Sequence, residues 1–588
     1  WLQSSDYVMN ARPSERSREQ ITRIIPKSAR QNVQMFTLQD NSPEGGVLLV
    51  GGNLSEKGQR IEVAPDRLDR VQIRPVMSYS LGNFETYFSN PVLTQSIGNS
   101  VIVALLVVLI VIPLAFVFAY GLTRTFMPMK STFRLIATIP VLIPSLLPGI
   151  GLVYLFGEQG ILKSWLMGES LYGPIGIVMA SAFFTFPHAL IIMVIALSTT
   201  DQRLYEAAQV LGASKWRTFR MVTIPGARYG IVSAFFVVFT LVITDFGVPK
   251  VVGGDFNVLA LDIYKQVVGQ QNFQIGAVVS LILLLPSVLA FTVDRINARK
   301  QVALMSAKAV PYQPQPDFLR DVSVTSVCVL VSIYILGILL MCQAAAVIKF
   351  WPYDLSISFR HFDFDRMDGG GWQSFYNSLF MAASAATIGG ALIFLGAYLT
   401  EKMRSSSLMR SVLHMMAMIP MAVPGMVLGL AFIFFFNEPS NPLYFLYGTM
   451  AILVINTISH LYTVPHISAM TALKQLDGEF ESVSMSLKQP FWRSLTRVTV
   501  PVCAPAMGEI WLYIFVNAMT TVSAVVFLYS PTTQLASVAV LNMDDAGDIA
   551  PAAAMGMMIF YSNVTARLIY YGIFARYFKR GQRWRTAS

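Results

Sequence analysis

One acidic side chain lies towards the end of a long apolar stretch of this chain of 588 residues. Asp245 falls in the stretch at residues 229–249, where an ionisable group is costly to desolvate and is therefore a functional candidate. Its carboxylate could contact an ammonium group or a metal ion, beside the hydroxyl of Thr244 and with Ser523 near the equivalent place of a later stretch. The alternative interpretation is a helix-end carboxylate that nearby backbone groups cap.

Two histidines follow prolines in apolar stretches. They are His188 and His466, which occupy matched places in two similar parts of the chain. A proline frees a carbonyl one turn earlier, and a neighbouring polar side chain can satisfy it, so the matched pair favours a structural role over substrate contact. No His, Cys or carboxylate cluster has metal-ligand spacing, and Cys328, Cys342 and Cys503 show no paired spacing. The sequence therefore predicts no catalytic residue and no metal site.

A polar loop with the sequence EAAQVLGASKWRTFRMVTIP occupies residues 206–225, between two long apolar stretches. Trp216, Phe219 and Val222 follow helical spacing and could form its buried face. Gly212 permits a reversal close to another backbone, and Pro225 ends the loop where the next apolar stretch begins. A short amphipathic helix that basic residues hold at a membrane face is suited to contact a soluble partner.

A related but degenerate loop occupies residues 481–501. Aligned on its last proline, this loop matches the first loop at Leu487, Trp492, Arg493 and Pro501. Its glutamate, Glu481, lies one place before the expected position. Lys488 stands where the first loop has Gly212. Either both loops bind a partner, or they are merely basic helices on a membrane surface.

The composition is that of a membrane protein. Charged residues make up 13% of the chain and mean hydropathy is +0.56, whereas soluble domains contain about 25% charged residues. A helix crosses the hydrocarbon with about 20 apolar residues, and backbone groups in lipid must be satisfied internally. The sequence predicts an all-α polytopic fold with spans near 97–121, 134–156, 173–197, 229–249, 272–293, 322–347, 375–399, 412–436, 448–470, 506–528 and 551–574.

The distribution of Lys and Arg between the spans predicts their orientation. One set of connections carries 25 basic residues and the alternate set carries 6. The richer set comprises residues 122–134, 198–228, 294–321, 400–411, 471–505 and the tail at 575–588. Because basic residues favour the cytoplasmic side, we expect both polar loops to face the cytoplasm. The positive charge follows membrane topology rather than one clustered face, so no nucleic-acid partner is expected.

Matched features recur along the chain at a nearly constant spacing. The matched features are Asn99-Ser100 with Asn377-Ser378, Ala119-Tyr120 with Ala397-Tyr398, Pro140 and Pro144 with Pro420 and Pro424, Pro187-His188 with Pro465-His466, and Pro225 with Pro501. Their common order indicates a parallel internal repeat. The proline runs mark either flexible gates or packing kinks, and both interpretations stay open.

The repeat divides the chain into four parts. We expect an extracytoplasmic segment at 1–90 with strand-like runs at 33–38 and 46–50, a first repeat at 91–300, a cytoplasmic linker at 301–321 and a second repeat at 322–588. The second repeat opens with the span at 322–347, which has no counterpart in the first. We therefore expect a further span before Trp1; the alternative is that the first repeat has one span fewer.

The first polar loop resembles the EAA loop of bacterial ABC importer permeases, which has the form EAA-x3-G-x9-I-x-LP. Glu206, Ala207, Ala208, Gly212 and Pro225 carry the resemblance. Residues 97–577 also resemble fused, two-repeat permeases of the ferric-iron and 2-aminoethylphosphonate importer group, through YGPIGIV at 172–178, FPHAL at 186–190, TDFGVPK at 244–250 and DIYKQVVGQQNF at 262–273.

The resemblance implies two type I ABC importer permease units in one chain, in a bacterial inner membrane. In that family the loop is a coupling helix that docks into a groove on an ATPase subunit. The sequence contains no G-x-x-x-x-G-K-[ST] motif, so ATP would be bound by two partner ATPase subunits and this chain would hold no cofactor. An external solute-binding protein would deliver a small-molecule substrate.

The best substrate assignment by resemblance is 2-aminoethylphosphonate, with ferric iron and polyamines as alternatives. Two other classes of protein compete with an ABC permease. An ion-coupled secondary transporter would need buried charge pairs near the midplane, and few are visible beyond Asp245. A membrane enzyme would need a clustered nucleophile, base or metal site, and the sequence shows none.

Overall fold

The computed structural model describes residues 35–40, 47–51, 71–75, 81–304, 310, 312–402, 407–476 and 479–574. The chain divides into two compact units, Trp1–Thr86 and Tyr87–Ser588. The first unit contains an antiparallel sheet in the order β2-β1-β3, built from β1 (Met35–Asp40), β2 (Val47–Gly51) and β3 (Val71–Pro75). β1 and β2 fall where the sequence predicts strand-like runs.

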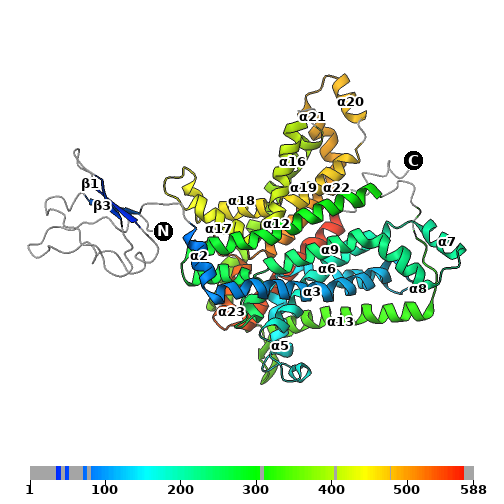
Figure 1. The fold of residues 1–588 in the computed structure, drawn as a ribbon, viewed down its shortest axis with the longest axis horizontal. Helices are drawn as coiled ribbons and strands as arrows, with labels where there is room; N and C mark the ends of the chain where they lie inside the picture. Colours follow the sequence, from blue (N-terminus) through cyan, green and yellow to red (C-terminus); the bar gives the residue numbers. More distant parts are fainter. Residues whose placement is uncertain are drawn as a thin grey trace, which may run out of the picture. The chain divides into compact units, whose positions relative to one another are not determined.

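Helices make up the first half of the second unit, as the continuous apolar runs require (Figure 1). A short helix, α2 (Gly82–Ser89), precedes them. The helices of this half are α3 (Pro91–Arg124), α4 (Lys130–Thr138), η3 (Ile139–Leu142), α5 (Leu146–Phe156), η4 (Lys163–Leu166), α6 (Pro174–Ser198), α7 (Gln202–Val210), α8 (Lys215–Thr218), η5 (Phe219–Thr223), α9 (Ile224–Thr244), α10 (Gly247–Val252), α11 (Leu259–Tyr264), η6 (Lys265–Gly269) and α12 (Phe273–Leu304).

The second half repeats this order after one additional span, α13 (Phe318–Val347), and a small hairpin of β4 (Ile348–Phe350) with β5 (Asp354–Ile357). Its remaining helices are η7 (Arg360–Phe362), η8 (Phe364–Arg366), α14 (Gly371–Ser384), η9 (Ala385–Gly389), α15 (Gly390–Glu401), α16 (Ser407–Ala422), α17 (Gly425–Phe436), η10 (Tyr444–Leu446), α18 (Met450–His460), α19 (Thr463–Lys474), α20 (Glu479–Ser486), α21 (Phe491–Ser494), η11 (Leu495–Thr499), α22 (Val500–Thr520), α23 (Ala536–Asp545), α24 (Ile549–Ile569) and η12 (Tyr570–Phe574).

The described residues contain eight helices long and apolar enough to cross a membrane, or up to eleven if each sharply bent pair is one span. Two bent pairs are matched in the repeat: α4–η3 with α5 at 106°, and α16 with α17 at 110°. The breaks fall at the proline runs, because a proline removes a helical hydrogen bond and clashes with the preceding turn. The third bend, 57° between α18 and α19, has no counterpart in the unbroken α6.

Each matched Asn-Ser pair makes the same contacts in its half. The Asn99 amide donates to the carbonyl of Asn257 at 2.9 Å, and the Ser100 hydroxyl accepts from the N–H of Leu259 at 2.8 Å. In the second half the Asn377 amide donates to the carbonyls of Thr532 and Gln534, both at 3.0 Å. The Ser378 hydroxyl accepts from the N–H of Ala536 at 2.8 Å. These pairs fix the start of α11 and of α23, so the repeat predicted from sequence also appears in the hydrogen bonding.

The two halves interlock through α13, which packs on α3, α4 and α5 of the first half and on α24 of the second. Gly121 and Gly151 allow this approach, since a Cβ on Gly121 would lie 2.8 Å from Val324 and one on Gly151 would lie 2.7 Å from the sulfur of Cys342. A span assigned to the second repeat by sequence thus lies against the first. The buried Asn563 of α24 also donates to the carbonyl of Leu142 at 2.9 Å, which adds a direct bond between the halves.

Candidate coupling and pathway sites

The first polar loop folds as two short helices that meet at a tight turn. We call residues 201–223 the first coupling segment; it comprises α7, α8 and the π-helical turn η5, which runs directly into α9. Asp201 caps α7 by accepting from the N–H of Arg203 at 3.0 Å, and Ser214 caps α8 by accepting from the N–H of Arg217 at 3.3 Å. Gly212 lies between them at φ +70°, a backbone conformation that favours glycine.

The alanines of the EAA motif have a backbone role in this turn. The carbonyl of Ala207 accepts from the N–H of Leu211 at 3.0 Å, and that of Ala208 accepts from the N–H of Ala213 at 2.9 Å. These bonds satisfy carbonyls at the helix end that have no partner within the helix. Glu206 and Ala207 are exposed on α7, and Pro225 is exposed at the start of α9. The motif therefore builds the turn and leaves its glutamate available to a partner.

The first coupling segment exposes large apolar side chains. Val210, Leu211, Trp216 and Met221 are 87%, 84%, 70% and 69% exposed. Trp216 stacks on Phe219 with ring centroids 5.6 Å apart. Phe219 in turn lies edge-on against Phe116 and Tyr120 of α3. Of the three residues assigned to one candidate buried face, Phe219 packs on a span, Val222 is half-buried and Trp216 remains exposed. Exposed apolar surface of this kind is typical of protein or membrane contact sites, so the segment is a candidate contact surface.

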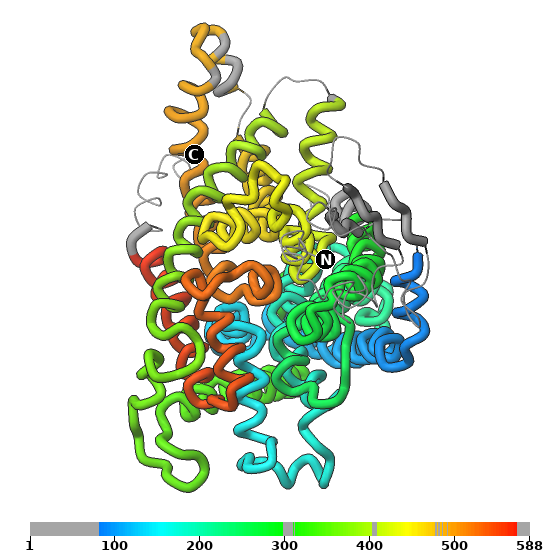
Figure 2. The backbone as a smooth tube through the Cα atoms, turned by 90° about the vertical axis from the view of Figure 1, so that its left-hand side faces the viewer, coloured from blue at the N-terminus to red at the C-terminus, as the bar shows by residue number. Residues whose placement is uncertain are grey.

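The second polar loop adopts the same turn despite its divergent sequence. We call residues 477–499 the second coupling segment; its described part comprises α20, α21 and the π-helical turn η11, and it projects from the body at the top of Figure 2. The N–H of Leu487 donates to the carbonyl of Val483 and that of Gln489 donates to Ser484, both at 3.0 Å. When the two segments are aligned on Pro225 and Pro501, both bonds coincide with the two turn bonds of the first segment.

Lys488 takes the place of Gly212 in that turn at φ +51°. The exposed apolar positions also persist, because Leu487 is 64% and Trp492 52% exposed. Glu481 lies within α20 and Pro501 is exposed at the start of α22. The second segment thus keeps the turn and the apolar surface, and loses the glycine and the alanine pair.

If the loop has the coupling role that the resemblance implies, Gly212→Val is expected to lower import several-fold while the chain stays in the membrane. A β-branched residue in the left-handed conformation costs about 1–2 kcal/mol, and relief of that strain would displace the turn. No atom of the described chain lies within 4 Å of a Cβ built on Gly212, so an internal clash is not the cause. Import and membrane extraction yield would be compared with Gly337→Val, which also adds a side chain where nothing lies within 4 Å. Import at the unmodified rate would contradict the expectation.

Asp245 lies where α9 ends, with φ −74° and ψ 131°. Its carboxylate accepts from the N–H of Val248 at 3.0 Å and so caps the short α10, while the hydroxyl of Ser145 is a further partner. Its neighbour Thr244 donates its hydroxyl to the carbonyl of Thr240 at 2.7 Å. The geometry supports the capping interpretation of Asp245, and Thr244 bonds within its own helix.

Ser523 lies near, and not at, the counterpart of Asp245. Thr521 has the matching backbone, with φ −69° and ψ 131° at the end of α22. Ser523 instead matches Gly247: a Cβ on Gly247 would lie 2.2 Å from the Ser145 hydroxyl, and one on Gly425 would lie 2.6 Å from the Ser523 hydroxyl. In each half, therefore, a serine hydroxyl lies close to a glycine. The serine comes first in the chain in the first half, and the glycine comes first in the second half.

An ion pair joins the two halves beyond the end of α9. The ammonium of Lys250 in α10 lies 2.6 Å from the carboxylate of Asp545 at the end of α23. The Lys250 ammonium also lies 5.3 Å from the ring centroid of Tyr264. The side chains of Lys250 and Asp545 are 21% and 39% exposed, so solvent screens the pair only in part. Sequence reasoning included Lys250 in the motif TDFGVPK and assigned it no role.

The matched histidines pack against aromatic rings one turn earlier. His188 lies 5.9 Å from the ring of Phe184, and His466 lies 5.6 Å from that of Tyr462. His466 is 1% exposed. Among the residues that the structure describes, no group of three or more His, Cys, Asp or Glu could hold a metal ion. The described geometry of both histidines is that of packed side chains beside a helix proline.

Comparison with known proteins identifies similar sequences. Residues 111–302 match the family model described as binding-protein-dependent transport system inner membrane component. The ferric transport system permease protein FbpB of Actinobacillus pleuropneumoniae is 26% identical over 466 residues, which are 76% of this chain and 67% of that protein. A spermidine/putrescine transport system permease protein PotC homolog of Mycoplasma genitalium is 28% identical over 233 residues, 40% of this chain and 73% of that protein. The molybdenum transport system permease protein ModB of Escherichia coli K12 is 30% identical over 162 residues, 26% of this chain and 69% of that protein.

Proposed function

Because the chain belongs to the family of binding-protein-dependent transport system inner membrane components, and is a multi-pass ABC importer permease rather than an enzyme, we propose that its two coupling segments are docking sites for two separate ATPase subunits. The observation that carries the proposal is the turn that recurs in both segments, with exposed apolar side chains on both copies. An ATPase groove would bury these side chains, as the apolar centre of a protein interface is buried.

The proposed cycle is alternating access driven by the partners. ATP binding would draw the two coupling segments together and open the pathway to the outside, and hydrolysis would reset it. An external binding protein would deliver the solute. Each step is a shift between conformations to which the partners bind with different affinity, so this chain would contribute docking, force transmission and a pathway.

We propose that the substrate is a small solute, and we favour ferric iron. A match of 466 residues to a ferric transport permease is too long for one repeat and must extend over both. The relatives reported above lend no such support to 2-aminoethylphosphonate, the assignment made from the resemblance of short motifs. Purifying the partner binding protein and measuring which ligand it holds decides between ferric iron, 2-aminoethylphosphonate and polyamines.

Co-purification tests the docking function. Affinity capture of the tagged chain from mild detergent is expected to retain two copies of an ATPase that contains a G-x-x-x-x-G-K-[ST] motif. An ion-coupled secondary transporter would retain none. The second measurement asks from which side of the membrane each segment can be reached. Cysteine variants at Glu206 and Glu481 are treated on intact cells with a thiol reagent that cannot cross the membrane. Cys328, Cys342 and Cys503 are buried, so background labelling should be low. Labelling of both variants from the outside would overturn the proposal.

A further inference from the structure

We propose that residues 310 and 312–317, the described part of the linker between the two halves, position the first coupling segment, and that Arg124 connects both to the spans α3 and α6. The inference rests on the ATPase-coupling function proposed above. The linker is then a working part of the coupling apparatus and Arg124 is a positioning residue, since it acts through the coupling segment.

Arg124 is the last residue of α3 and is 1% exposed. Its Nη2 donates to the carbonyl of Leu197 at the end of α6, at 2.5 Å. The centre of its guanidinium lies 4.0 Å from the ring centroid of Tyr312 in the linker and 4.9 Å from that of Tyr205 in α7. The two tyrosine rings lie 4.8 Å apart. Arg124 therefore holds together a span, the first coupling segment and the linker.

The described partners of the guanidinium are the Leu197 carbonyl and these two rings. Within the described part of the chain, no carboxylate pairs with Arg124, and its Nε and Nη1 have no hydrogen-bond partner. Burying a cation without an anion is costly, and the negative faces of aromatic rings attract a desolvated guanidinium. Removal of one ring would leave the charge poorly compensated, so the cluster responds to displacement of either tyrosine.

Backbone hydrogen bonds fasten the linker to the start of α7. The N–H of Gln202 donates to the carbonyl of Val310 at 3.0 Å, and the N–H of Gln313 donates to the side-chain oxygen of Gln202 at 3.3 Å. Tyr205 extends the connection further, because its hydroxyl bonds to that of Thr223 at 3.1 Å, in the last turn before α9. Movement of α7 would therefore reach both the linker and the base of α9.

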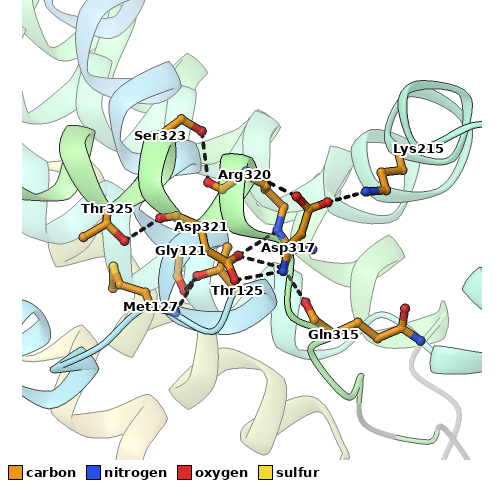
Figure 3. Close-up of polar contacts among 10 residues, drawn as sticks. All are labelled: Gly121, Thr125, Met127, Lys215, Gln315, Asp317, Arg320, Asp321, Ser323 and Thr325. Carbon is orange, nitrogen blue, oxygen red and sulfur yellow. Dashed lines mark hydrogen bonds and ion pairs between the residues drawn. The ribbon is translucent and has the colours of Figure 1, made fainter.

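A second attachment lies at the other end of the linker (Figure 3). Lys215 of the coupling segment forms an ion pair with Asp317, the residue that caps α13. The hydrogen bond from Lys215 lowers the pKa of the Asp317 carboxyl, which keeps it ionised. Asp321 accepts from the N–H of Asp317 at 3.2 Å and from the guanidinium of Arg320 at 2.7 Å. The linker is thus fastened to the coupling segment at both ends, and α13 follows directly.

The second half repeats one contact of this arrangement among the residues that the structure describes. Lys402 takes the place of Arg124 in the repeat and donates to the carbonyl of Leu476 at 3.5 Å, as Arg124 does to Leu197. Aligned on the prolines that end the two loops, Glu481 stands where the first half has Tyr205, so a carboxylate residue replaces the aromatic ring. Within the described residues, the carbonyl cap is present in both halves and the aromatic clamp is present in the first. The two coupling segments would therefore be held to their spans unequally, and so would the ATPase subunits that they bind.

The test uses the assembled complex with its ATPase subunits and compares Tyr312→Ala with Tyr312→Phe, which keeps the ring. The reporter is the double variant K250C/D545C, and the measured quantity is the fraction of it in which a thiol cross-linker joins the two halves. This fraction is measured with and without a non-hydrolysable ATP analogue. We expect the analogue to lower the yield several-fold in the reporter alone and in the Phe variant. In the Ala variant we expect this response to be lost while the ATPase subunits still co-purify. Tyr353→Ala is the matched control, because Tyr353 is 73% exposed and lies in the connection after α13.

Hydrogen exchange of residues 202–210 is the second measurement. Tyr312→Ala is expected to speed exchange there and to leave residues 479–486 unchanged, whereas Tyr312→Phe changes neither. An unaltered nucleotide response in the Ala variant, or an equal loss in the Phe variant, would overturn the inference. If the reporter without a Tyr312 substitution does not respond to the ATP analogue, the exchange measurement decides. Unchanged exchange at residues 202–210 in Tyr312→Ala would then overturn the inference. Failure of the unmodified chain to retain any ATPase would instead refute the proposed function.

Discussion

Replacing Leu211 and Trp216 together with glutamate is expected to abolish capture of an ATPase subunit by the first coupling segment and to reduce import at least about tenfold, equivalent to 1.4 kcal/mol. Leu211 and Trp216 are 84% and 70% exposed in the free chain, so the fold itself should lose little stability. Truncating a buried interface tryptophan commonly costs about 2 kcal/mol or more. Burial of two carboxylates in the same groove adds a desolvation cost.

Stoichiometry of the captured ATPase is the direct measurement. The matched variant is the double substitution L487E/W492E, which changes the equivalent positions of the second segment. Each double variant should lose one of two ATPase copies if the segments dock independently. Trp165→Glu is the control for an equally large change on an exposed tryptophan, because Trp165 is 71% exposed and lies in the connection between α5 and α6. Retention of two ATPase copies by both double variants would contradict docking on this surface.

The spans and the repeat could be predicted because each depends on a strong local signal. Apolar runs of about 20 residues leave the backbone no alternative to a helix in lipid. The prolines at Pro140, Pro144, Pro420 and Pro424 act on their own turns, and the structure bends the chain at both places by similar angles. The Asn-Ser pairs are identical in the two halves, which indicated the repeat, and their equivalent hydrogen bonds explain why the same residues recur.

Contacts between distant residues of different type could not be predicted. The clamp on Arg124 needs Tyr312, which lies far along the sequence in a proline-rich linker, and no periodicity links the two. The close approach of Ser145 to Gly247 recurs in the second half with the residue types exchanged, so neither position matches its counterpart. The left-handed turn at Lys488 could not be predicted either, because this position has a lysine at φ +51° and not the glycine that usually indicates such a turn. The two halves share their shape in these places without sharing residue identity.

The ion pair between Lys250 and Asp545 makes the strongest test of alternating access. A thiol cross-linker that joins the halves in K250C/D545C is expected to stop import almost completely, because the pathway could no longer open at that end. A cross-linker is preferable to a disulfide, since a long lysine side chain spans the gap and disulfides require short Cα separations. Uptake of the solute held by the partner binding protein is the measurement, and cleavage of the linker should restore it.

Charge variants separate the ion pair from the cross-link. Lys250→Ala removes an interaction worth roughly 0.2–1 kcal/mol for a partly exposed pair, so the resting complex should open more often and hydrolyse ATP somewhat faster without solute. The swapped variant K250D/D545K should return hydrolysis towards the original rate, since it restores opposite charges. The single variants K250C and D545C, treated with the same cross-linker, control for modification alone. Undiminished import by the cross-linked double variant would mean that the halves do not separate at this end, and the direction of opening assigned to the cycle would be wrong.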